Sequence, residues 1–405
     1  MKRTKLIIAS LLLLGSAGIA AAQSDMTTGL TGQTKNYIST GMPILLIAPD
    51  AISGAMGDAG AASTPDCNSG HWNNAKFAFI DGAMGVSTTY TPWLRNLGVG
   101  DMNLLYLGGY KSINSRSTVA ASLTFFSLGE IQSTDAEGNN KGTMNPNEFA
   151  FDVTYAMKLS EELSLGATGR FINSDLTNGQ NVSDGSGWVT TKPARSLAAD
   201  LGLYWQHDID KGSQVALGAF ISNMGAKLSY SNDDTQKEFL PANLRIGARY
   251  STDIDEANSI SLIVDINKLM VPTPPVTIGD STYSQYYRNM AEYYRTGVVR
   301  GAMQSFYDSP GGLAEEFREL QFSVGGEYWY KKTLAARAGY FYEDGTKGGR
   351  QYVTIGGGLR YNILQVDVAY LVPTTSFSSN PLSNTVRISL TFNFEKKSKS
   401  IQANF

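Results

Sequence analysis

The chain has 405 residues, a formal net charge of -3 and 17% charged residues, and it holds 42 glycines, 21 tyrosines and 17 phenylalanines. This balance of charge indicates no basic patch for nucleic acid, and a single cysteine, Cys67, excludes an internal disulfide. We therefore expect no nucleic-acid partner. Glycine and aromatic residues at this frequency favour a twisted antiparallel barrel with aromatic girdles.

The first 22 residues have the pattern of a secretory signal peptide. Lys2, Arg3 and Lys5 form a basic start, an apolar run follows over 6–14, and three alanines precede Gln23. The apolar run is roughly half of the ~20 residues that a membrane-spanning helix needs. We expect cleavage near Gln23 and export of the mature chain.

The segment 23–80 precedes the first predicted strand, and we interpret it as a hatch that fills a barrel interior. Residues 44–47 are too apolar for a solvated periplasmic leader, which is the alternative, and 51–62 is rich in small residues that pack closely. The candidate hatch residues are Ile44, Leu45, Leu46, Ile47, Met56 and Trp72.

From residue 81 onward the chain alternates apolar and polar residues, as a strand does when one face meets lipid and the other meets the lumen. In 386–394, for example, Val386, Ile388 and Leu390 alternate with Arg387 and Ser389. We predict fourteen strands, beginning near residues 81, 101, 117, 147, 162, 195, 213, 243, 258, 319, 333, 351, 363 and 384.

Short predicted connectors alternate with long ones, which is the asymmetry of periplasmic turns and extracellular loops in outer-membrane barrels. The expected fold class is therefore all-β, a transmembrane antiparallel β-barrel of about 14 strands over 81–394 with an N-terminal hatch. An even strand number puts both termini in the periplasm, with 395–405 as a short tail. Either Phe394 or Phe405 could be the assembly signal. The rival fold, a soluble β-sandwich, leaves the alternation of connector lengths unexplained.

Charges of both signs fall on the inward face of the predicted strands. A barrel of fourteen strands is wider than its own side chains can fill, so we expect a plug or water in the lumen. The predicted lumen charges are Asp152, Arg170, Asp200, Arg245, Arg249, Asp265, Glu327, Arg337, Arg360, Asp367 and Arg387.

The longest predicted connector, 270–318, is the first candidate for a binding function. Its proline-rich opening fixes an extended path, and tyrosines then recur at the three- and four-residue spacing of one helical face. The alternative is a helix folded over the barrel mouth, and the two interpretations are compatible. The candidate partner-binding residues are Pro272, Pro274, Pro275, Tyr283, Tyr286, Tyr287, Met290, Tyr293 and Tyr294.

The sequence has no recognisable catalytic or metal-binding motif. Only His71 and His207 occur, with neither the His-Glu-x-x-His nor the Gly-x-Ser-x-Gly pattern. Asp253 and Asp255 read as solvated turn residues, with weak support for calcium. We therefore expect no enzyme, no cofactor and no metal site.

Two stretches carry a resemblance to a known family. Residues 50–62, followed by His-Trp-Asn-Asn-Ala-Lys-Phe-Ala-Phe over 71–79, resemble the hatch of FadL-like barrels, most of all the branch found in Bacteroidetes. Residues 265–275, Asp-Ile-Asn-Lys-Leu-Met-Val-Pro-Thr-Pro-Pro, are similar to the segment that leads into the long loop of PorV proteins, also called LptO, of the type IX secretion system.

This resemblance implies a role in protein secretion. It implies that the barrel accepts exported proteins with a C-terminal secretion domain from a large outer-membrane translocon, and shuttles them to a surface attachment complex with a sortase-like protease. Outer-membrane lipid and lipopolysaccharide are further expected partners. A FadL-like transporter of hydrophobic small molecules is the alternative, which the lumen charges disfavour, and a structural barrel without cargo is a third.

Overall fold

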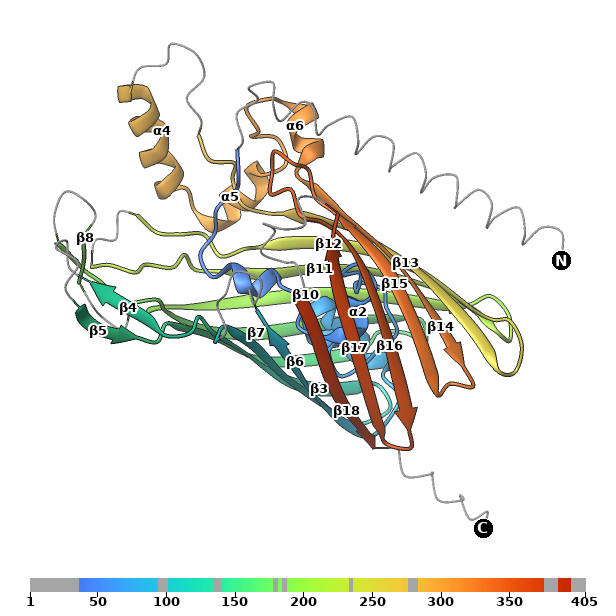
Figure 1. Ribbon diagram of the computed structural model, residues 1–405. Helices are drawn as coiled ribbons and strands as arrows, with labels where there is room; N and C mark the ends of the chain where they lie inside the picture. The colour runs from blue at the N-terminus through green and yellow to red at the C-terminus, as the bar shows by residue number, and fades with distance from the viewer. Residues whose placement is uncertain are drawn as a thin grey trace.

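The computed structural model describes residues 36–93, 101–134, 140–177, 181–183, 188–232, 236–275, 283–374 and 385–394. Fourteen antiparallel strands form a closed barrel in which neighbours in the chain pair with one another and the last strand pairs with the first (Figure 1). The predicted fold class is confirmed. No helix in the described ranges combines the length and apolar character that a membrane crossing requires.

The strand boundaries follow the predicted ones closely, because each predicted start lies within three residues of an observed one. The barrel strands are β1 (Met84–Pro92), β2 (Asn103–Ser112), β3 (Ser117–Ser127), β6 (Asn147–Lys158), β7 (Leu163–Asp175), β10 (Ala194–Asp208), β11 (Ser213–Gly225), β12 (Asn243–Asp253), β13 (Asn258–Leu269), β14 (Leu320–Tyr330), β15 (Leu334–Tyr342), β16 (Gln351–Tyr361), β17 (Leu364–Pro373) and β18 (Thr385–Phe394).

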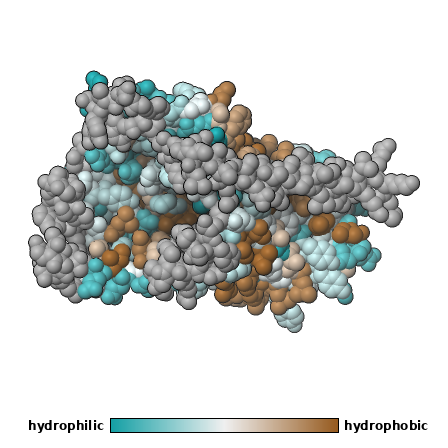
Figure 2. Space-filling view, turned by 45° about the horizontal axis from the view of Figure 1, so that its top comes forward, coloured by the Kyte–Doolittle hydropathy of each residue, from teal (hydrophilic) through white to brown (hydrophobic). Residues whose placement is uncertain are grey.

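Burial alternates along the strands, so one face meets lipid and the other meets the interior. On β10, for example, Leu197 and Leu201 are 69% and 58% exposed while Asp200 between them is buried. Figure 2 shows apolar side chains in brown on the barrel wall. Ten of the eleven predicted lumen charges are buried. The exception is Arg360, which is exposed because it lies one residue from the end of its strand.

The two ends of the barrel differ. At one end six connectors of at most four residues join the strands, and we call it the short-turn end. The other, the long-loop end, carries the helices α4 (Tyr283–Arg295), α5 (Val298–Gln304) and α6 (Leu313–Arg318) (Figure 1). Two hairpins, β4 (Ile131–Thr134) with β5 (Asn140–Met144) and β8 (Asn181–Ser183) with β9 (Trp188–Thr190), extend long connectors in which the sequence predicted only loops.

The described part of the hatch lies inside the barrel. Its elements are η2 (Pro43–Leu46), α2 (Ala51–Gly54), α3 (Ser69–Trp72) and η3 (Asn74–Phe79). The helix η3 packs against β3, β6, β7 and β10, whereas α2 packs against β16, β17 and β18 on the opposite side of the ring (Figure 1). The hatch therefore bridges the lumen from wall to wall.

Lumen charges hold the hatch by its backbone. Asp265 on β13 accepts hydrogen bonds from the amides of Gly60 and Ala61 at 2.7 and 2.8 Å. Arg249 Nε donates to the Ala62 carbonyl at 3.0 Å, and Arg387 Nε donates to the Ala48 carbonyl at 3.1 Å. Because a buried charge needs a hydrogen-bonding partner, these wall residues and the irregular hatch backbone stabilise each other.

We predict that added volume at the contact between wall and hatch destabilises the protein. A Cβ on Gly218 would overlap the Ala61 carbonyl oxygen, whereas a Cβ on Gly169, on the lipid side of β7, meets no atom within 4 Å. Gly218→Ala should lower the free energy of unfolding by about 1–3 kcal/mol. Urea titrations followed by tryptophan fluorescence measure this, with Gly169→Ala as the matched control. Equal midpoints for the two variants would refute the packing argument.

Candidate partner-binding site

The connector after β13 is fastened to the barrel rim by its first residues. Val271, Pro272 and Thr273 are buried, while Pro274 and Pro275 are partly exposed. Proline at these positions fixes φ and favours an extended path, as the sequence predicted. The start of the connector is therefore part of the rim, and its prolines have a structural role there.

The helix predicted from the tyrosine spacing is α4. Its residues Met290, Tyr293 and Tyr294 pack against Phe239 and Val271, and the rings of Tyr293 and Phe239 meet edge to face at 5.5 Å. Burial raises the pKa of the Tyr293 hydroxyl well above its usual value. These aromatic residues hold α4 on the rim. The side chains of the other three candidates, Tyr283, Tyr286 and Tyr287, lie outside the described residues.

The candidate hatch residues lie at two places in the lumen. Ile44 and Leu45 are buried in a cluster toward the long-loop end, with Ile47 packed against it, and Leu46 is partly exposed. Met56 packs against Ile263 in the barrel wall. Trp72 is fully buried, donates its indole N–H to Asp50 at 2.5 Å and lies beneath the Arg245 guanidinium.

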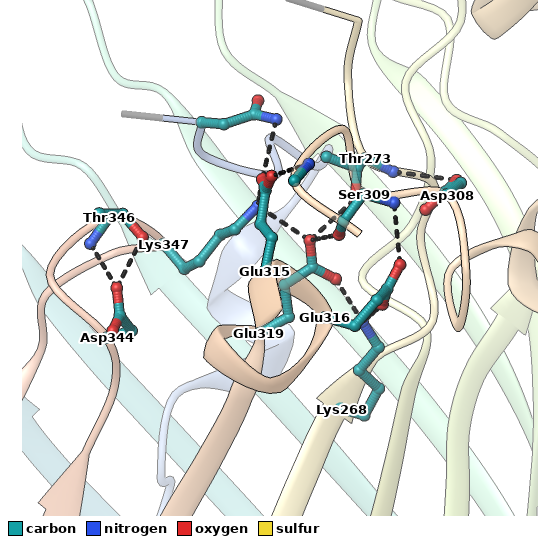
Figure 3. A network of polar contacts seen from close by, with 12 residues as sticks. Lys268, Thr273, Asp308, Ser309, Glu315, Glu316, Glu319, Asp344, Thr346 and Lys347 are labelled. Atoms are coloured by element: carbon teal, nitrogen blue, oxygen red, sulfur yellow. Dashed lines mark hydrogen bonds and ion pairs between the residues drawn. The ribbon is translucent and has the colours of Figure 1, made fainter. Parts of the chain in front are cut away.

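A buried network of ion pairs locks α6 to the barrel (Figure 3). Glu319, directly after α6, binds the ammonium groups of Lys268 on β13 and Lys347 in the connector between β15 and β16. Glu316 on α6 pairs with Lys268 at 3.0 Å, and Glu315 pairs with Lys347. Lys268 and the two carboxylates it binds have at most 8% of their side-chain surface exposed.

Hydrogen bonds from uncharged donors complete this network. The hydroxyls of Thr273 and Ser309 donate to Glu319 at 2.8 and 2.7 Å, and the amide of Ser309 donates to Glu316 at 2.8 Å. The amide of Thr273 also donates to Asp308 at 3.3 Å. Four parts of the chain therefore meet at the carboxylates of α6, and the connector has a defined position on the rim.

Burial alone would raise the pKa of Glu319, but the hydrogen bonds from Lys268 and Lys347 outweigh it and hold the pKa below its usual value. In the same way burial opposes and Lys347 produces a lowered pKa at Glu315. Asp308 behaves differently, because burial dominates and raises its pKa to about 6. The anionic state of the two glutamates is thus part of the folded connector.

The fastened helices α5 and α6 expose large apolar side chains to solvent. The most exposed are Val299 (67%), Met303 (66%), Tyr307 (69%), Leu313 (75%) and Phe317 (69%), which we call the loop apolar residues. Val299 and Met303 in α5 are four residues apart, as are Leu313 and Phe317 in α6, so each pair lies on one side of its helix. Tyr307 lies in the turn after α5. The helix α5 was not predicted from the sequence. The four-residue spacing of its apolar residues was the signal for a helix, but this spacing does not show whether the apolar side faces the barrel or water.

No group of three potential metal ligands occurs in the ranges that the structure describes. His71 lies in the hatch beside Trp72, whereas His207 lies near the short-turn end with its Nδ1 2.7 Å from Glu162. The two histidines are therefore not brought together. The most distinctive chemistry of the long-loop end is the loop apolar residues and their charged support.

An apolar outer wall around a closed barrel with a charged, occupied lumen defines a transmembrane protein of the outer-membrane barrel class. Residues 30–276 match the family described as "Type IX secretion system protein PorV". The chain belongs to the PorV family and is an outer-membrane protein of the type IX secretion system.

Several solved barrels are similar to this chain. The toluene transporter TbuX of Ralstonia pickettii is 13% identical with a TM-score of 0.49, over 86% of this chain and 99% of TbuX. The toluene transporter TodX of P. putida is 12% identical with a TM-score of 0.48, over 87% of this chain and 100% of TodX. A FadL homologue of Pseudomonas aeruginosa is 12% identical with a TM-score of 0.44, over 86% and 99%. A comparison with curated proteins gives no match.

Removing the negative charge of Glu319 should release the connector. Glu319→Gln leaves two buried lysines undercompensated, and breaking a buried ion pair typically costs about 3–5 kcal/mol. If cleavage follows local opening, we expect trypsin to cut after Arg300 roughly 100-fold faster or more. The matched control is Glu292→Gln, which neutralises an exposed carboxylate on α4. Equal cleavage rates in the two variants would contradict the anchoring role.

The network also predicts a pH dependence. Because Glu315 and Glu319 have lowered pKa values in the fold, their contribution is complete above about pH 4.5 and is lost as the pH falls further. Asp308 has the opposite effect on stability, because the fold favours its protonated form. Its contribution increases as the pH falls from about 6 towards the usual pKa of an aspartate. Amide hydrogen exchange in α6, corrected for intrinsic rates, should therefore stay slow from about pH 7 to 5 and accelerate below about 4. Acceleration already between pH 7 and 5 would contradict this.

Proposed function

We propose that this protein binds exported proteins through their C-terminal secretion domain and shuttles them from the outer-membrane translocon to a surface attachment complex with a sortase-like protease. The observation that carries the proposal is the exposure of the loop apolar residues on helices that a buried ionic network holds in place. Membership of the PorV family supplies the secretion context.

The proposal includes an orientation. Short turns face the periplasm and long loops face outward in outer-membrane barrels, so the long-loop end faces outside the cell. β18 ends at the short-turn end, which puts Phe394 on the periplasmic side. The described hatch, in contrast to the prediction for the N-terminus, starts at the long-loop end, where the Asn36 amide donates to the Thr346 carbonyl at 3.3 Å. The signal peptide is cleaved near Gln23 and the hatch begins there. In this orientation α5 and α6 meet the outer surface, where exported proteins arrive.

Exposed apolar side chains of this size favour a protein partner. Large apolar groups that stay in water on a folded surface typically mark interaction sites. Leu313 and Phe317 lie one helical turn apart, so they can enter one pocket of a partner together. Because the network fixes α6 beforehand, little additional ordering opposes binding.

The occupied lumen supports a non-catalytic function at the rim rather than transport through the barrel. Passage of a hydrophobic molecule, the alternative, would need an apolar path beside the hatch. The buried lumen charges Asp265, Arg249 and Arg387 bind the hatch backbone along that route. Transport therefore requires displacement of several charge-assisted hydrogen bonds, whereas partner binding at α5 and α6 requires none.

The test is recovery of partners from native outer membranes in mild detergent. The tagged protein should bring with it a very large outer-membrane partner and several exported proteins that share one C-terminal domain, identified by mass spectrometry. Leu313→Gln with Phe317→Gln should reduce this recovery at least about tenfold, because truncation of central apolar contacts costs 2 kcal/mol or more.

The matched control is Ile209→Gln with Ile254→Gln, which removes two apolar side chains that are 55% and 62% exposed at the short-turn end. It should leave the recovery unchanged. Undiminished recovery with the Leu313 and Phe317 variant would remove the loop apolar residues from the proposal. Recovery of the barrel alone with a bound hydrocarbon would favour transport.

A further inference from the structure

A second feature of the long-loop end is a cationic pocket of about 490 Å³. It lies where β10 begins and where the chain leaves β11. Its lining comprises Lys192, Pro193, Arg195, Lys227, Ser229 and Lys237. Four of these six residues carry a positive charge and none of the six is acidic. A concave surface with this lining attracts anions.

The pocket borders the lipid-facing wall of the barrel. Arg195 is exposed on the same face of β10 as Leu197, which is 69% exposed two residues further along. Two residues of a strand span roughly 7 Å. Arg195 therefore borders the exposed apolar residues of β10 on the side of the long-loop end.

The described contacts of Lys192, Arg195 and Lys227 fix these residues at the pocket without an acidic partner. The Lys192 amide donates to the Tyr230 carbonyl at 2.9 Å, and Arg195 Nε donates to Asn173 at 3.2 Å. Lys227 Nζ donates to the Tyr294 carbonyl of α4 at 3.2 Å and lies 3.6 Å from the centre of the Phe239 ring. Each of these partners is neutral.

The electrostatics of Lys227 agree with this. Burial is the main cause that lowers its pKa to about 8, Glu238 works in the opposite direction, and Lys237 lowers the value further. Lys227 is therefore a partly buried ammonium group whose charged form is disfavoured by burial. A bound anion would stabilise that charged form.

We propose that this pocket binds the phosphate of a phosphorylated glycolipid headgroup in the outer leaflet. The proposal rests on the outward orientation of the long-loop end given above, and it is independent of any protein partner. Arg195 supplies a guanidinium fork that matches a phosphate, and Lys192 and Lys227 supply point charges. The acyl chains of the same lipid would lie along Leu197 and Leu201.

A lipid source is favoured over a free phosphate ion by this geometry. A site for a small soluble anion needs an enclosed set of donors and no apolar neighbour, whereas this pocket opens beside an exposed apolar wall. Basic residues close to an anionic membrane surface contribute about 1 kcal/mol each to lipid attraction. A phosphorylated lipid satisfies both the cationic pocket and the wall.

Native mass spectrometry of the full-length protein in detergent can test this. The probes are bis-phosphorylated lipid A, dephosphorylated lipid A and inorganic phosphate. We expect the unaltered protein to retain phosphorylated lipid A roughly tenfold or more tightly than Lys192→Gln with Arg195→Gln, since two surface charges are lost. Dephosphorylated lipid A should not distinguish the two proteins.

The matched control, Lys111→Gln with Lys211→Gln, removes two exposed positive charges at the short-turn end and should retain lipid A like the unaltered protein. Arg195→Gln alone, which removes one charge, provides a milder variant if the double substitution does not fold. Equal retention by the unaltered protein and the pocket variants would overturn the proposal. Saturable binding of inorganic phosphate without a preference for phosphorylated lipid A would overturn the lipid assignment.

Discussion

Fourteen strands enclose more space than their own side chains can fill, and the rest of this structure follows from that constraint. The hatch and buried charged residues fill this space. Charges of both signs on the barrel wall bind each other and the backbone of the hatch. Arg170 lies between Asp152 and Asp200, and Arg337 lies between Glu327 and Asp367. Paired charges of this kind tolerate burial, and they give the irregular hatch backbone the partners that a sheet or helix would otherwise supply.

The same chemistry recurs at the long-loop end with a different result. There Glu316, Glu319 and Lys268 fasten a connector on top of the barrel and leave its apolar side chains in water. A flexible loop with the same residues would bury its apolar side chains against the barrel instead. Buried ion pairs contribute little to overall stability when compared with apolar packing, but they specify one arrangement. In this protein that arrangement is the exposed surface of α5 and α6.

Much of the barrel was predictable from the sequence because alternation is a local property. In a strand such as 386–394, the alternation of apolar and polar residues shows which side chains face lipid. The same period of two predicted the charges that face the lumen. The sequence could not assign the partners of those charges, since Asp265 and Gly60 are 205 positions apart. Nor could it predict that Tyr293 is buried while Phe317 is exposed, because both lie at helical spacing in an apolar pattern. That difference depends on contacts with other connectors, which form only in the folded barrel. Phe239 packs against Tyr293, and Lys347 pairs with Glu319 beside α6.

The position of the hatch has a consequence for biogenesis. The hatch precedes β1 in the chain, yet it lies inside a ring that closes only when β18, the last strand, pairs with β1. The hatch contacts the wall on two sides of the lumen, so a folded hatch that entered a finished barrel would have to pass between packed side chains. The nascent sheet must therefore curl around the hatch while its first edge remains open, and β1 must wait unpaired for the final strand. In this order the hatch, which precedes every strand in the chain, acts as the core around which the sheet closes, and the pairing of β18 with β1 encloses it.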